Sequence, residues 1–126
     1  MTVLLDTHIW LWWLADDPRL PHGAEDVLDD RRNVFFFSAA SVWEMAIKSA
    51  AGRLRVDADA VAEQTRTSGV NELPVTTSHA LQVSRLPSHH ADPFDRMLIA
   101  QSLVEPMRLM THDGTLAHYG ETILLV

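Results

Sequence analysis

The sequence predicts an α/β fold, a doubly wound three-layer sandwich in which helices cover both faces of a central parallel sheet. Short apolar segments alternate with helical segments along all 126 residues, which is typical of this class. The first apolar segment, Val3–Leu5, is uninterrupted and suits a strand that is buried on both faces. It ends at Asp6, so a carboxylate is expected at the sheet edge where open α/β folds bind ligands.

Five short segments are expected to form the strands of this sheet. Val34–Phe37 is the clearest of them, and it ends at Ser38. The third strand is expected at an edge of the sheet because Pro74 cannot donate a ladder hydrogen bond. The expected strands are Val3–Leu5, Val34–Phe37, Glu72–Val75, Met107–Met110 and Thr122–Val126.

The helices are delimited by residues that commonly cap helix ends. Asp57 and Thr77 are expected to cap N-termini, and Gly52 to close a C-terminus. Asp92 is expected to cap a helix that starts with Pro93. The expected helices are His8–Ala15, Pro21–Asp30, Ser41–Ala51, Asp57–Thr67, His79–Leu86, Pro93–Val104 and a short one from Gly114.

The first helix is apolar nearly all round, which implies burial on more than one side. Its Trp10, Trp12 and Trp13 cannot all face one direction at helical spacing. A helix wedged between the sheet and a neighbouring helix accounts for this pattern. Alternatively, Trp12 or Trp13 belongs to a surface that binds a partner, because aromatic residues are enriched at interfaces.

Length and composition indicate one domain, residues 1–126, that is large enough to bury a core. The chain is 47% apolar and 21% charged, as in ordinary globular proteins, and it has no cysteine. The longest apolar stretch, Val3–Leu14, contains Asp6 and His8 and is too short to span a membrane. No secretory leader is recognisable. We therefore expect a cytoplasmic protein without a membrane segment.

The net charge of −7 comes from 17 acidic residues against nine arginines and one lysine. This balance argues against broad binding to the nucleic-acid backbone, which normally needs a basic surface. It does not exclude a nuclease, because carboxylates around divalent cations are neutralised when the ions bind.

Four acids stand close to strand ends or early in the following helix: Asp6, Glu44, Asp95 and Asp113. Right-handed connections bring the carboxyl ends of parallel strands to one edge, so these acids are expected to converge. Several carboxylates in one pocket repel each other unless they are protonated or hold cations. Oxygen ligands without histidine or cysteine suit Mg²⁺ or Mn²⁺ rather than zinc. The helix dipole is expected to keep Asp95 ionised.

Each of these acids also has an interpretation as a helix cap. Asp6 and Asp113 precede helices, and Ser41 and Glu44 match a capping box. Asp92 with Asp95 is a looser version of the same motif. Four caps would still crowd one edge of the sheet with negative charge, so the joint pattern favours a metal pocket.

Four segments carry these acids together with their neighbours: Leu4–His8, Ser41–Lys48, Asp92–Gln101 and Leu109–Asp113. Together they resemble the acidic motifs of PIN domains, and more closely those of VapC toxins from type II toxin–antitoxin systems. The resemblance covers essentially the whole chain. It implies a five-stranded parallel sheet in the order 3-2-1-4-5, with the opening strand in the middle.

The resemblance also implies an endoribonuclease that depends on one or two Mg²⁺ or Mn²⁺ ions and hydrolyses RNA with a metal-activated water. Asp6, Glu44, Asp95 and Asp113 fall on the family's catalytic, metal-binding quartet. The residues expected to support the metal ligands are Thr7, Thr111 and Asp92.

The expected partners are an RNA substrate, a cognate VapB-like antitoxin that covers the site, and a second copy of the chain. A larger toxin–antitoxin assembly is a further expectation of the resemblance. Lys48 and Arg96 are expected to contact substrate phosphates. Further basic candidates near the acidic edge are Arg53, Arg55 and Arg85.

Three other functions are alternatives to this one. Seven histidines allow a metal-independent ribonuclease, with His89, His90 and His112 near the acids. A non-catalytic PIN-like module that binds proteins is a second alternative, because fold alone does not determine function. A phosphatase or receiver domain is disfavoured because Asp6 has no second aspartate two residues on, and no lysine stands near the late strands.

Overall fold

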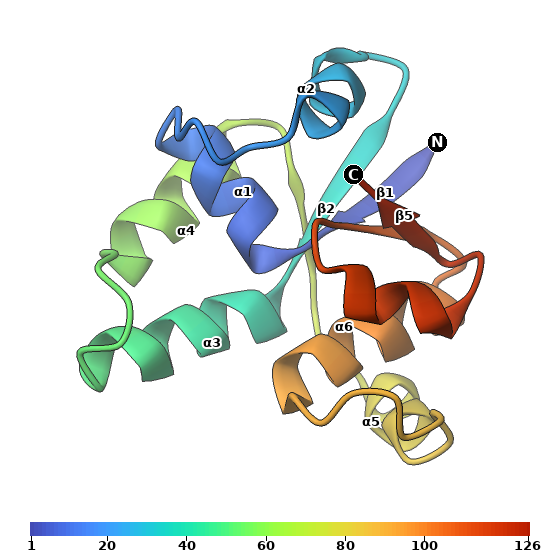
Figure 1. Cartoon of the computed structure of the whole chain (residues 1–126). Helices are drawn as coiled ribbons and strands as arrows, with labels where there is room; N and C mark the ends of the chain where they lie inside the picture. The colour runs from blue at the N-terminus through green and yellow to red at the C-terminus, as the bar shows by residue number, and fades with distance from the viewer.

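The computed structural model describes residues 1–126 and contains one sheet of five parallel strands. The sheet order is β3-β2-β1-β4-β5, with β1 in the middle (Figure 1). The predicted α/β class and the strand order 3-2-1-4-5 are therefore confirmed. The strands are β1 (Thr2–Leu5), β2 (Val34–Ser38), β3 (Asn71–Leu73), β4 (Arg108–Thr111) and β5 (Ile123–Leu125).

Helices connect the strands and cover the sheet on both sides. Figure 1 shows α1, α2 and α4 on one side of the sheet and α5 and α6 on the other. None of the helices has the length and apolar character that a membrane span requires. The helices are α1 (Thr7–Leu14), α2 (His22–Asp29), α3 (Ala39–Ala50), α4 (Ala58–Thr67), α5 (Thr77–Val83), α6 (Pro93–Val104) and the 3₁₀ helix η1 (Gly114–Tyr119).

The central strand supplies side chains to two separate hydrophobic cores. Val3 and Leu5 belong to the core shared with α1, and Leu4 belongs to the core shared with α6. All three side chains are fully buried. The uninterrupted apolar run is thus explained by alternation, because successive strand residues point to opposite, covered faces.

Helix α3 starts two residues before the predicted position. The Ser38 hydroxyl accepts a hydrogen bond from the Ala40 amide at 3.0 Å, so Ser38 is the cap. Ser41 therefore lies inside the helix, and the predicted capping box of Ser41 with Glu44 is wrong. This correction matters for the site, because it places Glu44 in the second turn of α3.

Other boundaries also differ from the prediction, mostly by one or two residues and by three at the end of α5, and several caps agree with it. Thr76, not Thr77, caps α5 by accepting from the His79 amide. Strand β3 lies at the sheet edge as predicted, but it ends at Leu73, before Pro74. The capping residues Asp57 and Asp92, and Gly52 just beyond α3 with φ of 72°, are confirmed.

Trp10 anchors α1 against α4 across the core. Its ring is buried, and its indole N–H donates a hydrogen bond of 2.8 Å to the Thr65 hydroxyl. Thr65 is itself buried and donates to the carbonyl of Val61 at 2.7 Å. The interpretation of α1 as a helix wedged between sheet and helix therefore holds for Trp10.

We expect Thr65→Val to lower the free energy of unfolding by about 1–3 kcal/mol, because the buried indole N–H of Trp10 loses its acceptor. Urea denaturation measures this change. Thr67→Val in the same helix is the matched control, since the Thr67 side chain is exposed, and its effect should stay within about 0.5 kcal/mol. Equal losses in the two variants would contradict the role given to this hydrogen bond.

Candidate active site

Four carboxylates from separate elements line one cleft at the carboxyl edge of the sheet. Asp6 directly follows β1, and Asp113 follows β4 at the start of η1. Glu44 lies in the second turn of α3, and Asp95 lies in the first turn of α6. Together with neighbouring side chains they enclose a cleft of about 450 Å³. The structure thus brings together the four acids that stand far apart in the sequence; that they bind metal stays a prediction.

The carboxylate of Asp6 is held from the neighbouring strand. The buried Thr111 hydroxyl donates to Asp6 Oδ2 at 2.6 Å, and the Asp113 amide donates to Thr111 Oγ1 at 3.0 Å. Asp6 occupies the N-terminal cap position of α1, but its side chain makes no capping hydrogen bond. The interpretation of Asp6 as a helix cap is therefore wrong.

Both oxygens of Glu44 have hydrogen-bond donors. The Thr7 hydroxyl lies 2.8 Å from Glu44 Oε1 and 2.8 Å from Ser41 Oγ. Because a carboxylate only accepts, Thr7 donates to Glu44 and Ser41 donates to Thr7. On the other side, Lys48 Nζ lies 2.5 Å from Glu44 Oε2, one helical turn along α3. Glu44 is thus a buried carboxylate whose charge is balanced by a lysine.

Asp92 and Asp95 divide two roles at the start of α6. Asp92 Oδ1 accepts from the amides of Phe94 and Asp95 at 2.8 and 3.0 Å, so Asp92 is the helix cap. Asp95 Oδ2 lies 2.7 Å from His90 Nε2, rather than closing a capping box with Asp92. Both aspartates line the cleft.

Asp113 is a helix cap that also faces the cleft. Its Oδ1 accepts from the amide of Thr115 at 3.0 Å and from the Thr115 hydroxyl at 2.7 Å. The cap interpretation is confirmed for Asp113, but it uses only one of the two carboxylate oxygens. Capping and lining the cleft are therefore compatible here.

The cleft concentrates negative charge enough to alter proton affinities. Burial raises the pKa of Asp6, and the hydrogen bond from Thr111 offsets this in part. Burial, with the charges of Asp6 and Asp92, raises the pKa of Asp95 to about 7 despite the contact with His90. The prediction that the helix dipole keeps Asp95 ionised is therefore wrong. For Asp113, burial opposes ionisation, but the hydrogen bonds from Thr115 outweigh it and lower the pKa.

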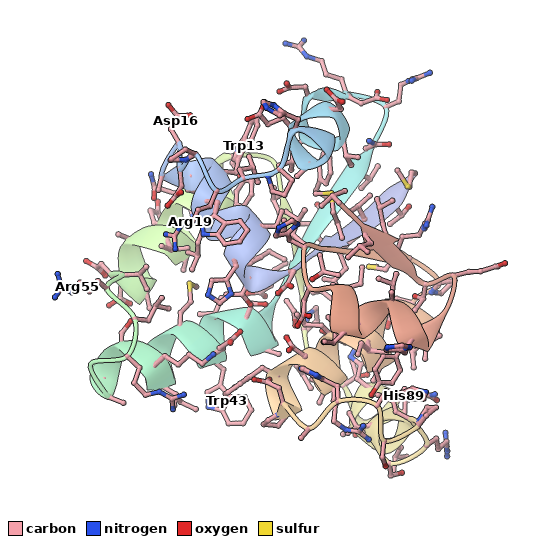
Figure 2. All side chains as sticks on the ribbon, in the orientation of Figure 1. Trp13, Asp16, Arg19, Trp43, Arg55 and His89 are labelled. Carbon is pink, nitrogen blue, oxygen red and sulfur yellow. The ribbon has the colours of Figure 1, made fainter.

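The cleft is also lined by His8, Trp12 and Arg19, which the sequence did not assign to the site, and by His112, which it had placed near the acids. Trp12 packs between His8 and His112, with ring centroids 5.9 and 6.2 Å away. Arg19 lies over the Trp12 ring at 5.5 Å, close to α1 in Figure 2. His8 and Trp12 are one helical turn apart just after Asp6, and this spacing was an available signal. No sequence pattern pointed to Arg19.

The basic residues proposed to contact substrate are placed very differently from one another. Only Lys48 among them lines the cleft. Arg96 donates to backbone carbonyls of the loop before α6, including that of Pro87 at 3.0 Å, and does not line the cleft. Arg55 points outward at the periphery of the molecule (Figure 2). Arg53, Arg55 and Arg85 are likewise absent from the cleft wall.

The comparison with known families defines the class of this protein. The sequence profile of the PIN domain family matches residues 3–121, nearly the whole chain, and the protein belongs to this family. The family resemblance of the four acidic motifs is thereby confirmed.

Known relatives agree with this membership. The chain is 30% identical over 121 residues to Ribonuclease VapC22 from Mycobacterium tuberculosis (strain ATCC 25618 / H37Rv), covering 91% of this chain and 89% of that protein. It is similar in structure to a chain of VapBC2 from Rickettsia felis, a crystal structure of VapBC2 bound to a DNA fragment from its promoter. That match has a TM-score of 0.70 at 12% identity and covers 100% and 98% of the chains. A toxin–antitoxin complex from Klebsiella pneumoniae matches with a TM-score of 0.64 at 16% identity, over 97% and 95%.

The raised pKa of Asp95 predicts a pH-dependent stability. Between the ordinary value of 3.8 and about 7, the folded protein holds a proton on Asp95 that the unfolded chain has lost. The stabilisation that this bound proton gives to the folded protein is therefore complete below about pH 4. It is lost as the pH rises to about 7. We expect the stability of Asp95→Asn, relative to wild type, to increase over this range when melting is followed without divalent ions. A difference between the two proteins that does not change with pH would contradict the assignment.

Proposed function

We propose that this protein is a divalent-metal-dependent endoribonuclease, the toxin of a toxin–antitoxin module that acts in the cytoplasm. The observation that carries the proposal is the cleft lined by Asp6, Glu44, Asp95 and Asp113. The raised pKa of Asp95 supports it, because its carboxylate is buried and lies near the charges of Asp6 and Asp92, and a bound cation would favour the ionised form. The similarity to a protein named Ribonuclease VapC22 favours RNA as the substrate.

The donor atoms of the cleft fit Mg²⁺ or Mn²⁺. Carboxylate oxygens are the ligands that these ions prefer. Asp6, Glu44, Asp95 and Asp113 would hold one or two ions. Such ions supply Lewis-acid chemistry, which activates water and neutralises charge on a phosphodiester. The residues proposed to support these ligands are Thr7, Thr111 and Asp92, and each contacts a member of the quartet.

The chain's own residues position the substrate and limit the charge in the cleft. Thr111 and Thr7 hold Asp6 and Glu44 in place through hydrogen bonds of 2.6 and 2.8 Å. Lys48 and Arg19 are the basic side chains that line the cleft, so they are placed to attract RNA phosphates. Of these, Lys48 keeps its predicted role as a substrate contact, and we add Arg19 beside it.

The contacts of His89 and His90 argue against a metal-independent mechanism in which these two neighbours act together, whereas His112, the third candidate, lines the cleft. His89 packs edge-on against Tyr119 with ring centroids 5.2 Å apart, whereas His90 contacts Asp95. The two rings therefore do not face one reacting atom as an acid and base pair. A non-catalytic protein-binding module does not require four acids in one cleft, so the complete quartet favours an enzyme.

We expect Asp6→Asn to reduce RNA cleavage by at least about a thousandfold while the protein stays folded, because the substitution removes a buried anionic ligand. Sequencing of RNA ends after expression of each protein measures cleavage, and circular dichroism checks the fold. Excess EDTA should stop cleavage by the wild type. Undiminished cleavage by Asp6→Asn would refute the site, and cleavage in EDTA would revive the histidine mechanism. Asp26→Asn, on helix α2 away from the cleft, is the matched control.

We also propose that a VapB-like antitoxin binds over the cleft and that the toxin forms a homodimer within a larger assembly. The similarity to a VapBC protein and to a toxin–antitoxin complex supports the antitoxin, and the homodimer rests on the family resemblance. The protein expressed alone should run at twice its 14.1 kDa chain mass in light scattering. The product of a neighbouring small reading frame should co-purify with it and suppress cleavage. A monomer in solution would contradict the homodimer. A product of the neighbouring reading frame that binds without suppressing cleavage would contradict the antitoxin.

A further inference from the structure

The loop between α5 and α6 (residues 84–92) brings an imidazole to the acidic cleft from its flank. His90 Nε2 lies 2.7 Å from Asp95 Oδ2. One nitrogen or oxygen atom each from His90, Asp95 and Asp113 lies within 4.8 Å of the other two. The side chains of His90 and Asp95 are partly buried, with exposures of 22% and 20%. Three elements of the fold thus present a nitrogen and two carboxylates to one point.

These distances suit ligands of a single cation. The hydrogen bond between His90 Nε2 and Asp95 Oδ2 needs one proton between the two atoms, because each atom has a lone pair directed at the other. The same two lone pairs can face a metal ion instead. Adjacent ligands of an octahedral ion lie about 3 Å apart and opposite ligands about 4.2 Å apart. Small side-chain rotations therefore bring His90, Asp95 and Asp113 into one coordination sphere.

Arg96 holds this loop in the conformation that presents His90. Its Nη1 donates to the carbonyls of Pro87 at 3.0 Å and His90 at 3.2 Å, and its Nη2 donates to the Val83 carbonyl at 3.0 Å. The Tyr119 hydroxyl also donates to the Pro87 carbonyl at 3.0 Å. A ligand that is already positioned loses less conformational freedom when the cation binds. Arg96 is therefore a positioning residue for the loop.

We propose that His90 Nε2 is a ligand of the divalent cation, beside the carboxylates of Asp95 and Asp113. This inference rests on the proposed metal-dependent function and names one ligand of its cation. An imidazole nitrogen binds first-row transition ions better than it binds Mg²⁺. The site therefore discriminates more strongly in favour of Mn²⁺ over Mg²⁺ than an all-oxygen site does.

Pulsed EPR of the full-length protein loaded with Mn²⁺ detects a directly bound nitrogen. We expect nitrogen hyperfine coupling in the wild type and its loss in His90→Gln, which keeps an amide to hydrogen-bond Asp95 but lacks the imidazole. Calorimetry should show that Mn²⁺ affinity falls by at least about tenfold in this variant. Mg²⁺ affinity should fall less. Circular dichroism establishes that each variant is folded.

His89→Gln is the matched control for this experiment. His89 is the neighbouring residue in the same loop, but its ring packs against Tyr119 and His118 and not against the acids. It should keep both the nitrogen coupling and the Mn²⁺ affinity of the wild type.

Two results overturn the proposal while leaving the metal-dependent function intact. Mn²⁺ bound to the wild type without nitrogen coupling would mean that His90 only orients Asp95. Coupling that persists in His90→Gln would assign the nitrogen to one of the two histidines that line the cleft, His8 or His112. A wild type that binds no Mn²⁺ would refute both the ligand and the proposed function.

Discussion

The hydrogen bond from Thr111 to Asp6 joins the ends of the two central strands and holds a carboxylate inside the protein. The geometry of the cleft depends on it. Thr7, the residue after Asp6, starts α1 and donates a hydrogen bond to Glu44 of α3. The Asp113 amide donates to the Thr111 hydroxyl. Thr111 at the end of β4 and Thr7 after β1 therefore make the hydrogen bonds that position the carboxylates of Asp6 and Glu44, and Thr111 also accepts from the Asp113 backbone.

Burying several charged carboxylates in one cleft is unfavourable, and the surrounding residues compensate some of these charges better than others. Lys48 neutralises Glu44, and donors from Thr115 favour the charged form of Asp113. Asp6 and Asp95 have no basic partner of comparable strength, and burial raises the pKa of each. Folding thus leaves a deficit of positive charge at one place in the protein, which is the condition under which a cation binds favourably.

Helix caps and candidate metal ligands are not exclusive interpretations in this protein. Asp92 and Asp113 each use Oδ1 for a helix N-terminus. The second oxygen of each carboxylate is then held in a defined direction by the same cap. Because several helices begin at the carboxyl edge of the parallel sheet, the positions that cap helices are also the positions that face the cleft.

Apolar runs and helix caps are local features, so the α/β class, the five strands and the four acids could be predicted from the sequence. The family resemblance of the acidic motifs supplied the strand order. The partner of each carboxylate could not be predicted, because it depends on tertiary contacts. Ser38 rather than Ser41 caps α3, so Glu44 does not serve in a capping box and instead contacts Thr7 and Lys48. Burial raises the pKa of Asp95 to about 7, and the loop held by Arg96 places His90 beside it. The contact of Thr7 with Glu44 and that of Thr111 with Asp6 join residues 37 and 105 positions apart, which local sequence patterns do not encode.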